Sequence, residues 1–303
     1  MEPGGERPIG VLRQRLPRGV APAVLGGVIA VLAVYVGHEV GRIAGRHEGA
    51  RALARARSST GGGIRVPLFV DPAAVRHGTR FNFTFDPVDV LAEYRRRENL
   101  DAIVATARTE FERAVALMHW ASAQWELGRP DPYPPIDALT ILRDIRAGRT
   151  AGFCAQYNYV FVQAVQSFGG RARYVTIRGH EVTEVWLSDL RKWICFDPTH
   201  DSYYTDAAGA PLSVHEISAA VKRGAPVALV GNPRAKDRDS DLGKFAWFAV
   251  WLKNDHVSAP INFADLRHYK LYFVEPGVER GHVPEESLET TALSDLYFDP
   301  LVP

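Results

Sequence analysis

Three short segments in a fixed order constrain the fold of this chain more than any other feature. Cys154 opens an apolar stretch of helical character that stops at Gly169-Gly170, a common helix-ending signal. His180 begins one segment rich in β-branched and aromatic residues, and Asp197 ends a second. The turn-like Ser188-Asp189-Leu190 joins these two segments, which predicts an antiparallel hairpin. We therefore expect an α+β fold in which a helix beginning at Cys154 packs on an antiparallel sheet.

The same three residues supply the groups that thiol catalysis requires. A thiol needs a base to become a thiolate, and the base needs an acceptor to hold its tautomer. Cys154 is expected at a helix amino terminus, where the dipole and free N–H groups favour the thiolate. His180 would take the proton, and Asp197 would accept a hydrogen bond from the other imidazole nitrogen. The structural alternatives are a small buried cysteine, a histidine without a catalytic role and a turn aspartate before proline.

Local motifs around these residues resemble the transglutaminase-like superfamily, which shares the papain-like arrangement of cysteine proteases. The resemblance covers roughly residues 105–205 and rests on four motifs: Gly152-Phe153-Cys154, Gly170 to Val175, His180 with Glu184-Val185, and Trp193 with Asp197-Pro198-Thr199. It implies a papain-like or transglutaminase-like core, a thioester on Cys154, and Cys154, His180 and Asp197 as the catalytic triad.

Three positions depart from the family pattern. Val182 stands where the family often has an aromatic residue, two positions after the histidine. Pro135 stands where cross-linking members carry the tryptophan that completes the oxyanion hole, and Gly148 where papain-type proteases carry a glutamine. The resemblance therefore carries over the nucleophile, the base and the orienting carboxylate, but no side-chain oxyanion donor.

Other residues are candidates for supporting roles. Gln156, Tyr133 and Trp120 are candidates to complete an oxyanion hole beside the backbone N–H of Cys154 or to line the cleft. Glu184 shares a strand face with His180 and is expected to support the site structurally rather than to react. Cys195 shares a strand face with Asp197 and is expected to pack in the core.

Residues 19–37 carry no charge, and as a helix they would rise roughly 28 Å, about the thickness of a hydrocarbon core. We expect a single transmembrane signal anchor; a cleaved signal peptide and a buried soluble helix are the alternatives. Arginines flank both ends, so the positive-inside rule gives no orientation. Because an N-terminal anchor ahead of one large domain usually serves export, we expect a single-pass membrane protein with an extracytoplasmic catalytic domain.

The expected organisation follows from this segment and from helical spacing. Apolar spacing predicts helices over residues 88–99, 100–127 and 137–146, with Asp137 as an N-cap. The expected parts are a tail (1–18), the anchor (19–37), a juxtamembrane Arg/Ala segment with a Gly-rich linker (38–63), and a domain (64–303) that has its core near 105–205 and an extension over 206–303.

Composition excludes several classes of function. The two cysteines, Cys154 and Cys195, exclude a disulfide scaffold, and no Cys/His cluster has zinc-ligand spacing. A net charge of +1 gives no support to nucleic-acid binding. No Gly-rich nucleotide motif appears, so neither a cofactor nor a metal is expected.

The sequence thus predicts thiol-dependent acyl chemistry, with hydrolysis of a peptide or amide bond in a protein or peptide substrate as the leading expectation. Transglutaminase-type amine transfer stays open, because water or an amine can release the acyl group. A non-catalytic protein that uses the same cleft for binding or assembly is the alternative of a different class.

Overall fold

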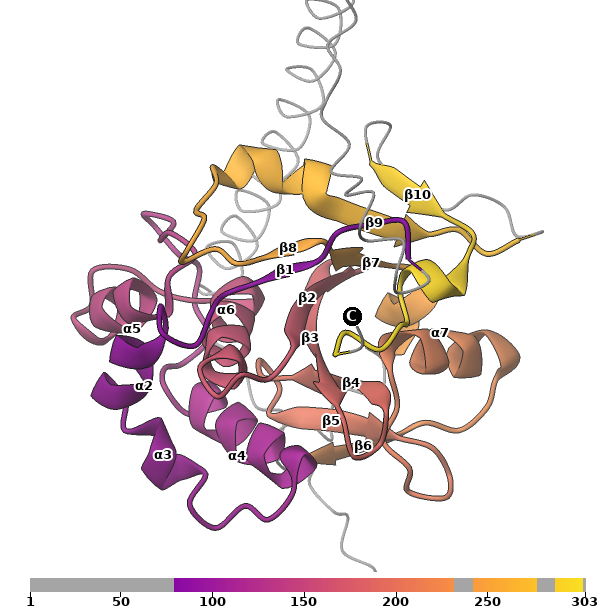
Figure 1. Ribbon diagram of the computed structural model, residues 1–303, viewed down its shortest axis with the longest axis horizontal. Coiled ribbons are helices and arrows are strands. Elements are labelled where there is room, and N and C mark those ends of the chain that lie inside the picture. Colours follow the sequence, from indigo (N-terminus) through magenta and orange to yellow (C-terminus); the bar gives the residue numbers. More distant parts are fainter. Residues whose placement is uncertain (1–78, 232–241, 277–286, 302–303) are drawn as a thin grey trace, which may run out of the picture. The chain divides into compact units, whose positions relative to one another are not determined.

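The structure is a computed structural model that describes residues 79–231, 242–276 and 287–301 (Figure 1). The helices are α2 (Ala92–Arg97), α3 (Leu100–Ile103), α4 (Glu110–Ser122), α5 (Ala138–Arg146), α6 (Cys154–Gln166) and α7 (Val214–Arg223), with 3-10 helices η3 (Phe263–Tyr269) and η4 (Leu293–Asp295). The strands are β1 (Thr84–Phe85), β2 (Ala172–Ile177), β3 (His180–Leu187), β4 (Lys192–Asp197), β5 (Ser202–Thr205), β6 (Ala228–Gly231), β7 (Phe248–Trp251), β8 (Lys253–Asn254), β9 (Lys270–Phe273) and β10 (Leu288–Thr290).

One large sheet organises the fold, with the strand order β10-β9-β7-β2-β3-β4-β5-β6. Its pairs are antiparallel except for β9 and β10, and β1 pairs with β8 in a separate parallel ribbon. The β2–β3 hairpin pairs Ile177 with His180, so a two-residue turn joins them and Gly179 takes a positive φ of 68°. The expected hairpin of β3 and β4 is confirmed, and the sheet is larger than the sequence indicated.

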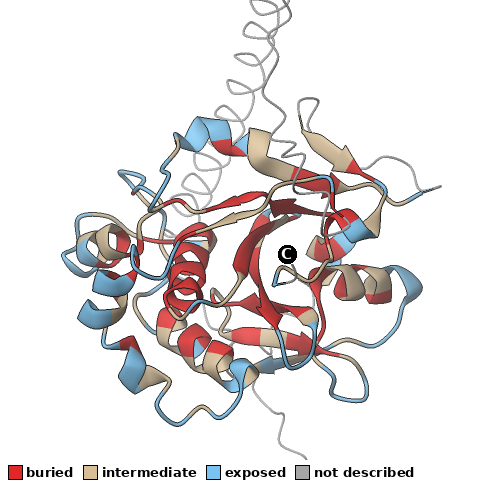
Figure 2. Ribbon diagram, viewed as in Figure 1, coloured by how far each residue is buried: buried red, intermediate tan, exposed pale blue. Residues whose placement is uncertain are grey.

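The two faces of the sheet bury separate hydrophobic clusters (Figures 1 and 2). Tyr174 and Phe196 face the cluster under α2 to α6, whereas Val175 and Cys195 face the cluster under α7 and the C-terminal segment. This alternation along one strand is the period-2 pattern that a sheet buried on both sides requires. The expected α+β architecture, with the cysteine helix packed on a mainly antiparallel sheet, is therefore present.

Helix α6 is buried from Ala155 to Gln166, so its apolar residues and its four amide side chains are enclosed on all sides. Most of the buried amide atoms find partners, as burial demands, but the amide nitrogen of Gln156 does not. The Gln163 side chain accepts a hydrogen bond from the backbone N–H of Ala138 (2.8 Å), and Gln166 accepts one from that of Asp86 (3.1 Å). The helix that carries Cys154 is thus fixed to the segments around it.

The single helix expected over residues 100–127 is wrong, because the chain forms α3 and α4 with a break between them. The Thr109 hydroxyl accepts a hydrogen bond from the backbone N–H of Glu112 (3.0 Å), and the Glu112 carboxylate accepts one from the N–H of Arg108. Thr109 therefore starts a new helix. The expected N-cap of α5 is confirmed, since the Asp137 carboxylate accepts from the N–H of Thr140 (3.2 Å).

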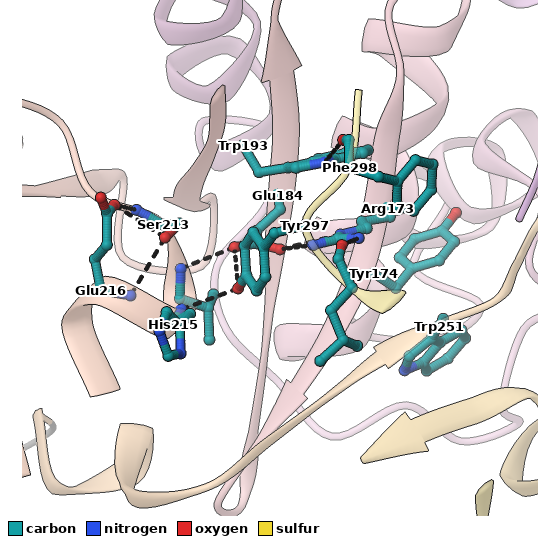
Figure 3. A network of polar contacts seen from close by, with 12 residues as sticks. Arg173, Tyr174, Glu184, Trp193, Ser213, His215, Glu216, Trp251, Tyr297 and Phe298 are labelled. Carbon is teal, nitrogen blue, oxygen red and sulfur yellow. Dashed lines mark hydrogen bonds and ion pairs between the residues drawn. The ribbon is translucent and has the colours of Figure 1, made fainter. Parts of the chain in front are cut away.

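The segment after residue 206 completes the sheet and its second core. A buried ion pair joins Arg173 of β2 to Glu184 of β3 (2.6 Å), and the Tyr297 hydroxyl donates to the other Glu184 oxygen (2.9 Å) (Figure 3). The Trp193 indole N–H donates to the carbonyl of Phe298 (3.0 Å). The C-terminal residues are thus bound to the central strands by partly buried hydrogen bonds.

The expected anchor at 19–37, the linker at 38–63 and the domain boundary at 64 lie outside the described residues. Within the part of the chain that the structure describes, no helix has the length and apolar content needed to cross a bilayer.

Candidate active site

The local backbone places Cys154 at the first position of α6. Phe153 is the extended N-cap residue, and the Gln156 side chain accepts a hydrogen bond from its backbone N–H (3.1 Å). The preceding Gly152 lies against Trp125, and a Cβ there would come within 2.6 Å of the indole nitrogen. Only glycine therefore lets the chain enter the helix at this point. The thiol lies where the free N–H groups of the first turn converge.

His180 and Asp197 meet at the ends of neighbouring strands. The Nε2 atom of His180 lies 2.9 Å from Oδ2 of Asp197, and the aspartate is completely buried. The Cys154 thiol is an electrostatic neighbour of His180 and is among the groups that raise the pKa of that histidine. Because Nε2 is bound to the carboxylate, Nδ1 is the ring nitrogen left for the thiol. The three residues expected from the sequence are thus brought together from α6, β3 and β4.

A second histidine, which the sequence analysis did not single out, shares the Asp197 carboxylate. Nδ1 of His200 lies 2.7 Å from Oδ2, and the His200 ring stacks on His180 with centroids 4.9 Å apart. The backbone N–H groups of Thr199 and His200 donate to Oδ1 (3.1 and 3.3 Å). The spacing of three residues after Asp197, across a turn, is the sequence signal that could have found it.

Charge pairing dominates the electrostatics of this cluster. Burial alone would lower the pKa of His180, but the Asp197 carboxylate, its hydrogen bond and the Cys154 thiol raise that pKa to about 10. Burial would raise the pKa of Asp197, yet His180 and the His200 hydrogen bond hold it far below its usual range. His180 is therefore held as an imidazolium beside an ionised aspartate at neutral pH.

Asn158 ties the cysteine to the histidine strand. Its buried side-chain N–H₂ donates to the carbonyls of Cys154 (2.8 Å) and Glu181 (2.7 Å), and its carbonyl accepts from the Thr183 hydroxyl (2.6 Å). The first turn of α6 is thus bound directly to β3. Local sequence patterns do not reveal this role of Asn158, because it depends on contacts between segments that are far apart along the chain.

The three candidate oxyanion residues are placed differently. Gln156 is completely buried beside the Tyr133 hydroxyl, and its amide nitrogen has no hydrogen-bond partner of normal geometry. Burial raises the pKa of Tyr133 to about 12, and the thiol of Cys154 is among its electrostatic neighbours. Trp120 instead packs against Tyr94, with ring centroids 6.2 Å apart. Gln156 and Tyr133 therefore lie near the thiol, and Trp120 is a packing residue.

Glu184 and Cys195 belong to the second core of the sheet. The Glu184 carboxylate binds Arg173, Tyr297 and the backbone N–H of Val214 (2.8 Å), so it holds the C-terminal segment and α7. Cys195 is a buried free thiol, and burial raises its pKa well above the usual range. Both side chains are completely buried there.

Among the described residues, one group has the donors and the proximity to hold a metal ion: His180, Asp197 and His200, whose candidate ligand atoms lie within 4.8 Å of one another. Imidazole and carboxylate are donors that zinc accepts. The Asp197 oxygens, however, already accept hydrogen bonds from both rings and from two backbone N–H groups. A metal here would have to displace the contacts that orient His180.

Residues 97–198 match the model of the transglutaminase-like superfamily. The mixed α+β fold with a large sheet fits the core of that family. A comparison with curated proteins finds no match. The matched stretch includes Cys154, His180 and Asp197 but ends before His200 and β5. The similarity of this chain to the transglutaminase-like superfamily therefore rests on residues 97–198.

Proposed function

We propose that this protein is a thiol-dependent enzyme that attacks an amide or related acyl carbon and forms a thioester on Cys154. The observation that carries the proposal is the arrangement of three groups: the Cys154 thiol is an electrostatic neighbour of His180, and His180 is hydrogen-bonded to Asp197. A nucleophile, a base and an orienting carboxylate in this sequence of contacts are the parts that acyl transfer by a thiol requires.

The two ring nitrogens of His180 have different roles in the proposed reaction. Nε2 is held by Asp197, which fixes the ring and stabilises its positive charge. Nδ1 faces the thiol, so in the resting enzyme it already holds the proton that Cys154 has given up, as a thiolate–imidazolium pair, and it gives that proton to the leaving amine as the thioester forms. In the second half of the reaction the same nitrogen takes a proton from the incoming water or amine, and the thiolate leaves.

The negative charge that develops on the substrate oxygen needs donors near Cys154. The backbone N–H of Cys154, at the first turn of α6, is one such donor. The buried amide of Gln156 lacks a partner, and the Tyr133 hydroxyl keeps its proton at neutral pH because its pKa is raised. We propose that these two side chains supply the donor that the family resemblance did not carry over.

We propose hydrolysis of a peptide or amide bond as the reaction, in a protein or peptide substrate. The position at which cross-linking relatives carry a tryptophan is Pro135, so the feature associated with amine transfer is missing. Amine transfer stays the alternative, because both reactions share the thioester and differ only in what attacks it.

The test is to trap and partition the acyl enzyme. The full chain is mixed with an activated acyl donor, such as a p-nitrophenyl ester of a short peptide, and Cys154 is examined by intact and peptide mass spectrometry. We expect acylation of Cys154, none in Cys154→Ala, and faster acylation than in His180→Ala. Adding a primary amine then decides the reaction type: unchanged turnover to free acid supports hydrolysis, and formation of the amide supports transfer. Absence of acylation in the unaltered chain would favour a binding or assembly protein.

Residues 19–37 are proposed as a membrane anchor with the catalytic domain outside the cytoplasm, on the basis of their uncharged sequence alone. Resistance of the full chain to extraction from membranes by alkaline carbonate, and sensitivity of the domain to protease added outside intact cells, are the expected results.

A further inference from the structure

Three aromatic side chains form an exposed cluster beside the candidate nucleophile. Within the described residues, Tyr133, Phe153 and Phe263 are the aromatic side chains that are more than a third exposed, at 37%, 36% and 58%. Single exposed apolar residues are ordinary, but these three gather at one place. Phe153 immediately precedes Cys154, so the cluster lies next to the thiol.

The rings contact one another in series. Tyr133 meets Phe153 edge to face, with centroids 6.0 Å apart, and meets Phe263 in a tilted arrangement at 4.7 Å. These separations and angles are those of favourable aromatic pairs. The cluster is therefore an ordered surface built from the loop before α5, the N-cap of α6 and η3.

The 3-10 helix η3 fixes Phe263 in this place. In a 3-10 helix residues three apart lie above one another, so the face that carries Leu266 also carries Phe263. Leu266 is buried in the core, while Phe263 extends past its edge onto the ring of Tyr133. A large apolar side chain is thus held in water beside the reacting group, which costs free energy unless a ligand covers it.

The polar edge of the cluster is incompletely satisfied. The hydroxyl of Tyr133 lies 3.4 Å from that of Tyr159, and the buried Gln156 amide nitrogen beside it has no regular partner. One oxygen of Glu181 is also buried without a partner, while the other lies 4.0 Å from the Lys270 ammonium. A ligand that presents apolar surface to the rings and a carbonyl oxygen to the amide would satisfy both parts.

We propose that Tyr133, Phe153 and Phe263 form a subsite for an aromatic or large aliphatic group on the acyl side of the substrate. This inference rests on the proposed function. His180 protonates the leaving group, so the leaving group lies toward His180. The acyl part then lies toward the donors on Tyr133 and Gln156, where the rings are. The substrate class is an amide or peptide with a bulky apolar side chain next to the scissile carbonyl.

The experiment compares two irreversible probes that differ only in that side chain: the chloromethyl ketones of benzyloxycarbonyl-phenylalanine and benzyloxycarbonyl-glycine. The thiolate sulfur displaces chloride from each, so one C–S bond forms and one C–Cl bond breaks. The second-order inactivation constants are measured for the full chain, with labelling of Cys154 checked by mass spectrometry. We expect the phenylalanine probe to react at least about tenfold faster, the selectivity that an apolar pocket gives for a large group.

Variants of Phe263 test whether the aromatic cluster causes the faster reaction of the phenylalanine probe. The ratio of the two constants within each variant cancels changes in thiol reactivity. We expect Phe263→Ala to lower the ratio several-fold, Phe263→Tyr to keep it, and Leu190→Ala to leave it unchanged. Leu190 is a matched control because it is 47% exposed and lies in the β3–β4 turn, at the end of β3 remote from His180.

Two further results separate the subsite from the function on which it rests. If iodoacetamide labels Cys154 in a His180-dependent way but the probe ratio is near one, or is unchanged by Phe263→Ala, the subsite proposal is wrong and the proposed function stands. If labelling of Cys154 does not depend on His180, both proposals fall.

Discussion

His200 shows how one extra contact can adjust the carboxylate of the candidate triad. Asp197 divides its charge among two imidazole rings and two backbone N–H groups. Each donor that stabilises the aspartate lowers the share of its charge that acts on His180. His200 is therefore placed to moderate the basicity of His180 without touching the thiol.

Replacing His200 should shift the titration of its neighbour. His200→Phe keeps a ring against His180 but removes a donor to Asp197, so the His180 imidazolium should gain stability and its pKa should rise. His200→Asn can keep a donor and should leave that pKa close to the original. NMR titration of the ¹⁵N-labelled histidines measures the pKa of His180. An unchanged pKa of His180 in His200→Phe would mean that His200 is only a packing residue.

The raised pKa of His180 also predicts how stability depends on pH. The folded pKa of about 10 exceeds the usual 6.5, so the stabilisation from the His180–Asp197 pair is complete below about pH 6.5. It is lost as pH rises from there toward 10. Urea unfolding at pH 6.5 and pH 10 should show a larger loss in the unaltered chain than in His180→Gln. Equal losses would show that the pair adds no stability.

The proximity of Cys154, His180 and Asp197 could be predicted from sequence because each residue lies in a local motif: a helix start, a strand start and a strand end. Asn158 and Phe263 could not, since their roles arise from contacts with Glu181 and Tyr133 that only the folded chain creates. A local sequence pattern can reveal a residue whose role depends on its neighbours along the chain. It cannot reveal a residue whose role depends on a partner far away in the sequence.

At the scale of elements, the link between α6 and β3 decides whether the thiol and the imidazole meet. The buried Asn158 side chain supplies that link through two donated hydrogen bonds, which are partly buried, and one accepted bond, which is buried. The backbone carbonyls of Cys154 and Glu181 would lose these donors if the amide were removed. A buried polar group without a partner costs about 1–3 kcal/mol.

Asn158→Ala should therefore lower the free energy of unfolding by about 2 kcal/mol or more and slow the alkylation of Cys154. Urea unfolding and iodoacetamide kinetics measure the two effects. Asn262→Ala is the control, because Asn262 is exposed and its side chain makes no capping hydrogen bond. If Asn158→Ala alkylates as fast as the control, the link does not position the thiol.

The break between α3 and α4 coincides with a capping signal in the sequence that apolar spacing does not take into account. Thr109 and Glu112 have the spacing of a helix-starting pair, and their hydrogen bonds divide the expected helix there. Capping residues therefore locate helix boundaries that hydrophobic periodicity alone does not detect, because the apolar spacing continues through them. The caps at Asp137 and the end of α6 near Gly169 were read correctly for the same reason.

At the scale of the whole molecule, the segment after residue 206 is part of the fold and not an appendage. It supplies β6, β7, β9 and β10 to the sheet, covers the second core with α7, and closes the buried Arg173–Glu184 pair. The strand pairings of this segment were not predictable, since strands that come later in the chain pair with β2 and β5.

Tyr297→Phe tests this role. The change removes the hydroxyl that donates to Glu184 (2.9 Å) and accepts from the backbone N–H of His215 (2.9 Å). Because a hydrogen bond to a buried carboxylate is lost, the free energy of unfolding should fall by about 1.5–3 kcal/mol. Tyr203→Phe is a matched control, since Tyr203 packs through its ring against Phe111 at 5.1 Å. Equal unfolding curves for the two variants would show that the C-terminal contact is not stabilising.

The measurement that tests the central claim most directly is the alkylation rate of Cys154 by iodoacetamide across pH, in the full chain and in His180→Ala. A poised thiolate should react rapidly below pH 7, and removal of the imidazole should abolish that reactivity and move labelling to above about pH 8, where an ordinary thiol ionises. Labelling only above about pH 8 in both proteins would contradict the account, and the site would then be a binding cleft on an enzyme-like fold.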